Sequence, residues 1–113
     1  MRIKESASEG IGILSFDGNL VLDEATELRT LIKPYLEEQK FSGLICNLEG
    51  VEYIDSSGIG ILVSIFKSLK RFDKKFALTG LNQRNREVLN LSKLDKLLII
   101  APDNESAVKI LKE

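Results

Sequence analysis

The chain has 113 residues, 43% of them hydrophobic, and a formal net charge of −1, which predict one globular domain with its own core. The near-neutral charge gives no field that would attract nucleic acid, and no stretch reaches the ~18 apolar residues of a membrane span. The absence of histidine excludes Ser–His and Cys–His nucleophile pairs and histidine metal sites. The single cysteine, Cys46, is expected to be a buried thiol in a cytoplasmic protein.

The N-terminal part predicts a β-hairpin followed by a helix. Residues 2–8 and 11–17 are predicted strands, and a Glu-Gly pair between them favours a tight turn. Hydrophobic residues then recur at spacings of three and four, which predicts an amphipathic helix with Asp23 as its N-cap. Pro34 lies within this pattern and lacks a backbone N–H, so we expect the helix to bend or end early there.

The central part predicts a buried strand and a second helix. Residues 44–48 are mostly apolar and too few for a helix, which favours a central strand. The second helix is expected from about Ser57 to about Arg71. Its predicted core stripe comprises Ile59, Leu62, Val63, Phe66 and Leu69. Ile61 and Ile65 fall beside this stripe, where they either widen the buried face or form an apolar shoulder for a partner protein.

The C-terminal part continues the alternation of strands and helices. The predicted elements are a strand at residues 75–79, a helix at 85–91, a strand at 96–100 and a final helix after Pro102. Asn82 or Asn85 is expected to cap the first of these helices, and Asp103 or Asn104 the second. The whole order, β-β-α-β-α-β-α-β-α, predicts an α/β fold with a mixed sheet covered by about four helices.

One stretch at the centre of the chain, Tyr53-Ile-Asp-Ser-Ser-Gly-Ile-Gly60, carries the strongest functional signal. Its Asp-Ser-Ser sequence is typical of a helix N-cap beside free backbone N–H groups, and this is the simplest interpretation. A cap needs only one such side chain, however, and Gly58 and Gly60 each lower helix stability by about 1 kcal/mol. This combination suggests that space is kept for an approaching partner. The spacings of a phosphate-binding loop and of a nucleophile elbow are both absent.

The same stretch closely resembles the phosphoacceptor motif of STAS-domain anti-sigma factor antagonists. The resemblance extends to residues 44–48, 76–82, 86–89 and 94–97 and so covers essentially the whole chain. It implies one STAS domain over residues 1–113, without catalytic residues, cofactor or metal. It also implies that Ser56 is the phosphorylated residue, while Ser57 is a cap or structural hydroxyl.

In such a family the protein acts as a partner switch. The resemblance implies that the unphosphorylated chain binds an anti-sigma factor, which is also a serine kinase, and that phosphorylation releases it until a serine phosphatase restores binding. The expected partner surface comprises Asp55, Ser56, Ser57, Gly58, Ile59, Ile61 and Ile65. We expect a monomer or weak dimer that contacts neither membrane nor nucleic acid. The alternative is a STAS interaction module in a stress-sensing scaffold, a non-sigma partner switch or a transporter accessory subunit.

The chain departs from the family after the second predicted strand. The family commonly has Gly-acidic-Leu-Asp there, whereas this chain has Gly18-Asn-Leu-Val21. Asn19 and Val21 thus replace both acidic residues. Because the family's aspartate lies near the phosphorylation site, we expect this change to bear on which kinase the chain recognises.

Overall fold

The computed structural model describes residues 1–37 and 41–113, and within them five strands form one sheet in the order β1-β2-β3-β4-β5. The antiparallel β1–β2 pair is followed by parallel pairing from β2 to β5. The strands are β1 (Arg2–Ser8), β2 (Ile11–Asp17), β3 (Gly43–Gly50), β4 (Lys75–Thr79) and β5 (Ile99–Ala101). The helices are α1 (Leu22–Glu37), α2 (Ser56–Arg71), α3 (Gln83–Leu91), the short 3₁₀ helix η1 (Leu94–Lys96) and α4 (Asn104–Leu111). The predicted fold class is confirmed.

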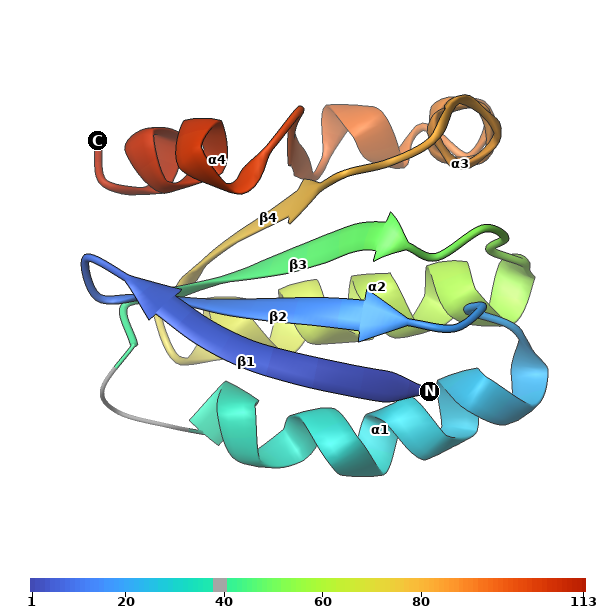
Figure 1. The fold of residues 1–113 in the computed structure, drawn as a ribbon, viewed down its shortest axis with the longest axis horizontal. Coiled ribbons are helices and arrows are strands. Elements are labelled where there is room, and N and C mark those ends of the chain that lie inside the picture. The colour runs from blue at the N-terminus through green and yellow to red at the C-terminus, as the bar shows by residue number, and fades with distance from the viewer. Residues whose placement is uncertain (38–40) are drawn as a thin grey trace.

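Helices cover both faces of the sheet, with α1 and α2 on one side and α4 on the other (Figure 1). The alternation of side chains along β3 explains this arrangement. Leu44 and Cys46 belong to the core shared with α1 and α2, whereas Ile45 belongs to the core shared with α4. All three side chains have no exposed surface, so β3 is the buried central strand that its composition predicts.

The hairpin forms as predicted. Ser8 pairs with Ile11, and the two residues between them, Glu9 and Gly10, have φ angles of 52° and 83°. Positive φ at both positions matches the right-handed twist of the flanking strands. The hairpin therefore places β2 beside β3, and the end of β2 leads directly towards the central turn.

The first helix differs from the prediction at both ends. It begins at Leu22, so Asp23 lies in its first turn and is not its N-cap. It continues to Glu37, three residues beyond Pro34, so the expectation of an early end is wrong. The N–H that proline lacks would bond to the carbonyl of Thr30. Both residues are exposed, and water can therefore satisfy that carbonyl.

The last strand is shorter than predicted. Residues 93–98, before this strand, form a turn that contains η1. Lys93 lies in the left-handed region (φ 62°), and the N–H of Leu98 donates to the carbonyl of Leu94 at 2.8 Å. Leu98 is buried while Leu97 is half exposed, so the apolar run reflects packing of a turn and not a strand. Residues 96–98 consequently lie outside β5, which pairs with β4 only from Ile99 onward.

The later helix caps follow the first member of each predicted pair. Asn82 caps α3 by accepting a 2.8 Å bond from the N–H of Asn85, and Asp103 caps α4 by accepting one from Ser106 at the same distance. The hydrogen bonds from Ser106 hold the pKa of the Asp103 carboxyl below its usual value. Both helices therefore begin at fixed positions beside the ends of the parallel strands.

Cys46 is fully buried, and this burial raises the pKa of its thiol far above the usual value. Because only the thiolate reacts readily, we expect native protein in mildly alkaline buffer to resist iodoacetamide. Labelling should follow the rate of unfolding and become rapid in denaturant, which mass spectrometry can measure. Rapid labelling of the native protein would show that β3 is not closed off from solvent.

Candidate functional site

The central turn is a helix cap built by Asp55. This residue has extended backbone (φ −101°, ψ −173°), and its Oδ1 accepts bonds from the N–H groups of Ser57 at 2.9 Å and Gly58 at 3.0 Å. Neither serine is the cap, so of the two roles predicted for Ser57, cap or structural hydroxyl, the cap is wrong. The N–H groups expected to be free are also mostly occupied, and in the described part of the chain only Ser56 N–H remains unbonded at this helix end.

Ser56 is the first residue of α2 and is exposed, whereas Ser57 is half-buried. Among the described residues, the Ser56 hydroxyl has no hydrogen-bond partner. One helical turn further on, a side chain added at Gly60 would meet no atom within 4 Å. The surface beside Ser56 is therefore open, and its hydroxyl can be reached by another protein.

The segment after β2 holds this turn in place. Leu20 forms a parallel bridge with Ile54, in which Leu20 N–H donates to the carbonyl of Tyr53 and Asp55 N–H donates to the carbonyl of Leu20, both at 3.0 Å. Asn19 adds a bond, because its Oδ1 accepts from Tyr53 N–H at 3.1 Å. Asn19 thus supplies an acceptor oxygen at the position where the family commonly has an acid. This role for Leu20 and Asn19 could not be recognised in the sequence.

Helix α3 supports the other side of the same segment. The side-chain amide of Asn82 donates to the carbonyl of Glu52 at 3.0 Å, and that of buried Asn85 donates to the carbonyl of Val51 at 2.9 Å. The guanidinium of Arg84 lies 5.8 Å from the centre of the Tyr53 ring, a distance typical of a cation–π contact. The turn is consequently fixed from two sides, by the loop after β2 and by the start of α3.

The two glycines of the turn have different roles. A methyl group on Gly58 would collide with the carbonyl oxygen of Leu20 and lie 2.7 Å from Leu20 Cβ and 2.9 Å from Ile54 Cγ2. Gly58 therefore allows the first turn of α2 to pack against Leu20 and Ile54. The interpretation that Gly58 keeps space for a partner is wrong. Of these two glycines, only Gly60 borders open space.

Of the two alternatives for Ile61 and Ile65, the structure confirms the wider buried face, and the apolar shoulder for a partner is wrong. Both side chains are 1% exposed and face α1 and the core, so they widen the buried face of α2. The buried stripe comprises Gly58, Ile61, Leu62, Ile65 and Leu69. Ile59, Val63 and Phe66, which were expected to be buried, are only half-buried. Among the residues expected to contact a partner, Ser56 is exposed, Asp55, Ser57 and Ile59 are half-buried, and Gly58, Ile61 and Ile65 are buried.

Removal of the cap should weaken the start of α2. We expect Asp55→Ala to lower the free energy of unfolding by about 1 kcal/mol, because the N–H groups of Ser57 and Gly58 lose their acceptor. Asp55→Asn keeps an amide oxygen in place and should lose less than half as much. Urea denaturation of the three proteins measures both changes. Equal stability of Asp55→Ala and the unchanged chain would show that this cap contributes nothing.

The described residues offer no group of three His, Cys, Asp or Glu side chains that could hold a metal ion. No helix among them is both long enough and apolar enough to cross a membrane.

Comparison with known proteins places this geometry in a family. The model of the family described as STAS domain matches residues 3–107. The anti-sigma-B factor antagonist of Staphylococcus aureus is 27% identical over 88 residues, covering 78% of this chain and 81% of that protein. The crystal structure of a candidate anti-sigma factor antagonist from Thermotoga maritima has the same fold, with a TM-score of 0.91, 24% identity and coverage of 98% and 95% of the two chains. The phosphorylated Bacillus cell fate determinant SpoIIAA also shares the fold, with a TM-score of 0.70, 18% identity and coverage of 96% and 99%.

Proposed function

Because the chain belongs to the STAS domain family, we propose that it is an anti-sigma factor antagonist whose binding to its partner is switched by phosphorylation of Ser56. The observation that carries this proposal is the state of the Ser56 hydroxyl, which is exposed and has no hydrogen-bond partner among the described residues. The backbone beneath it is fixed by Asp55, Leu20 and Asn19. A fixed backbone with an accessible hydroxyl suits a residue that two enzymes must recognise.

The electrostatics of the turn explain how a phosphate would release the partner. A phosphate adds a charge of about −1.5 to −2 and three acceptor oxygens. The N–H groups of Ser57 and Gly58 already bond to Asp55, so they are not available to bind and neutralise the phosphate. The added charge therefore stands next to the carboxylate of Asp55 and faces the partner. Repulsion and desolvation then lower affinity without any change of fold.

The proposed partners are those that the resemblance to anti-sigma factor antagonists implies. The unphosphorylated chain binds an anti-sigma factor that is also a serine kinase, and a serine phosphatase reverses the modification. The chain is the substrate of both enzymes and catalyses nothing itself. We place the switch in the cytoplasm, with residues 1–113 acting as one STAS domain that is a monomer or weak dimer.

An affinity experiment with three forms of the chain tests this function. Unchanged protein, Ser56→Ala and Ser56→Asp are immobilised and exposed to extract of the source cells, and bound proteins are identified by mass spectrometry. We expect the first two to retain a protein with a histidine-kinase-like serine-kinase fold and the third to lose it. Ser6→Asp, which adds the same charge at an exposed serine of β1, is the matched control and should retain the partner. Equal recovery by all forms would contradict the proposal.

A further inference from the structure

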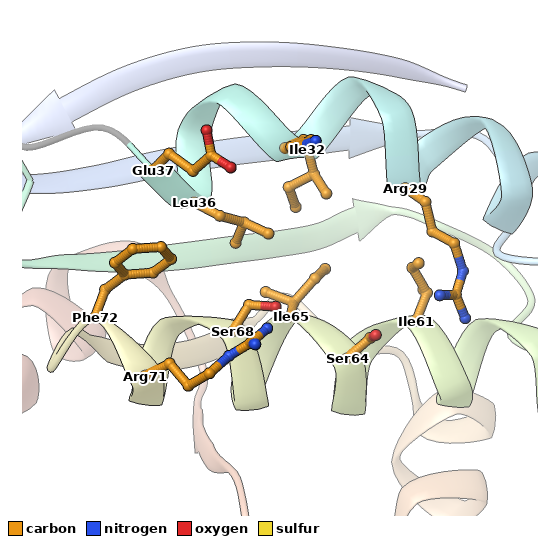
Figure 2. Close-up of a pocket in the computed structure, with 11 residues that line it drawn as sticks. Arg29, Ile32, Leu36, Glu37, Ile61, Ser64, Ile65, Ser68, Arg71 and Phe72 are labelled. Carbon is orange, nitrogen blue, oxygen red and sulfur yellow. The ribbon is translucent and has the colours of Figure 1, made fainter.

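A groove lies between helices α1 and α2, on the side of α2 that faces α1 (Figure 2). Ser56 is not among the residues that line it. Its volume is about 510 Å³, within the range of ~300–1,000 Å³ typical of small-molecule sites. Ile32 and Leu36 of α1 face Ile61 and Ile65 of α2 across it, and Phe72 lies at one end. Ile32, Ile61 and Ile65 are almost fully buried, so the floor of the groove is apolar.

The rim of this groove is positively charged. Arg29 and Lys33 from α1 and Arg71 from α2 line it, against one carboxylate, that of Glu37. In the part of the chain that the structure describes, none of the three cations forms an ion pair. Arg29 extends from α1 towards α2, and Arg71 lies beside Ser68 (Figure 2). Cationic groups without partners above an apolar floor are complementary to a ligand that combines an anionic group with an apolar body.

We propose that this groove is a binding site for a small anionic amphiphile, with an unbranched apolar chain and a carboxylate or phosphate monoester head. The apolar chain packs on the isoleucine and leucine side chains of the two helices. The head binds a guanidinium at the rim, Arg29 or Arg71, and the hydroxyls of Ser64 and Ser68 supply further hydrogen bonds. This inference does not depend on the proposed function, because neither Ser56 nor any other residue of the turn at 53–58 lines the groove.

Four probes with the same ten-carbon chain separate the contributions of head and tail. Decanoate and decyl phosphate carry the two anionic heads, decanol is neutral, and decyltrimethylammonium is cationic. Each is titrated below its micelle concentration into isotope-labelled protein, and the backbone amide shifts are followed by NMR. We expect at least one anionic probe to bind and to shift the resonances of α1 and α2 around Leu36, Ser64 and Ser68. Decanol should bind about tenfold more weakly and the cation not measurably, because the rim repels it.

Variants locate the site. Arg29→Ala with Arg71→Ala is expected to weaken the anionic probe by about tenfold, since the exposed charge-assisted contact to the head is lost whichever of the two arginines makes it. Both side chains are exposed, so the double variant should keep its melting temperature. Arg86→Ala on α3 removes an equally exposed arginine elsewhere and is the matched control. Ser68→Phe, which fills the groove, should abolish binding of every probe.

The outcome identifies the head group or overturns the site. Binding of decanoate alone assigns a carboxylate ligand, binding of decyl phosphate alone a phosphate ligand, and binding of both shows that the rim selects charge without selecting geometry. The proposal is overturned if neither anion binds, if decanol binds as tightly as the anions, or if the shifts lie away from α1 and α2. Unchanged affinity in the double arginine variant would overturn it as well. Loss of partner switching at Ser56 would leave each of these results unaffected.

Discussion

Replacement of Gly58 by alanine is expected to lower the free energy of unfolding by about 3 kcal/mol, because the added methyl has no space and forces the backbone to move. The nearest atom is the carbonyl oxygen of Leu20, which is itself bonded to Asp55 N–H. Leu20 cannot yield without breaking the bridge to Ile54. Gly58→Ala should therefore weaken the Leu20–Ile54 bridge together with the first turn of α2.

Gly60 provides the matched control for this prediction. It lies in the same helix two residues further on, but a methyl there meets nothing within 4 Å. Gly60→Ala should therefore raise stability by up to about 1 kcal/mol through helix propensity alone. Urea denaturation of both variants measures the difference, which should be about 4 kcal/mol. Equal effects of the two substitutions would show that α2 does not pack against Leu20 as described.

The second large effect is expected at Ser56. We predict that Ser56→Asp lowers affinity for the anti-sigma factor by about 100-fold, which corresponds to about 2.7 kcal/mol. The new carboxylate stands beside that of Asp55, whose Oδ1 is held by two backbone N–H groups. Because Asp55 cannot turn away without giving up the helix cap, the like charges remain close. Ser56→Ala removes only an unbonded hydroxyl and should retain affinity within about threefold.

The fold of Ser56→Asp must be intact for this result to bear on the switch. Ser56 is exposed and bonds to no described residue, so the substitution should leave the circular dichroism spectrum unchanged. Acidic residues in the first turn also favour a helix, so the melting temperature should not fall. A loss of affinity accompanied by unfolding would contradict release through an altered surface.

Local patterns in the sequence were sufficient for much of the fold. The Glu9-Gly10 turn, the strand at residues 75–79 and the caps at Asn82 and Asp103 all depend on neighbours along the chain, and each lies at a predicted position. The motif around Ser56 was found for the same reason, since an Asp-Ser-Ser-Gly turn between strand and helix is a local signature.

Features that depend on distant contacts were not predictable. Two stripes of α2 have nearly the same spacing, one through Ile59 and Val63 and one through Ile61 and Ile65. The choice between them is made by Gly58, which must face Leu20, and no pattern within the helix shows that contact. Two further features also join segments far apart in the chain. One is the set of bonds from Asn19 and Leu20 to residues 53–55, and the other is the cationic rim of the α1–α2 groove.

The most direct test is a titration of the anti-sigma factor with two forms of the same chain, unmodified and phosphorylated on Ser56. Calorimetry gives the two dissociation constants, and circular dichroism of each form shows whether the fold is retained. We predict tight binding by the unmodified chain, a loss of at least about 100-fold on phosphorylation, and superimposable spectra. Equal affinities, or a phosphorylated chain that has lost its helical signal, would contradict a switch made by added charge on an unchanged fold.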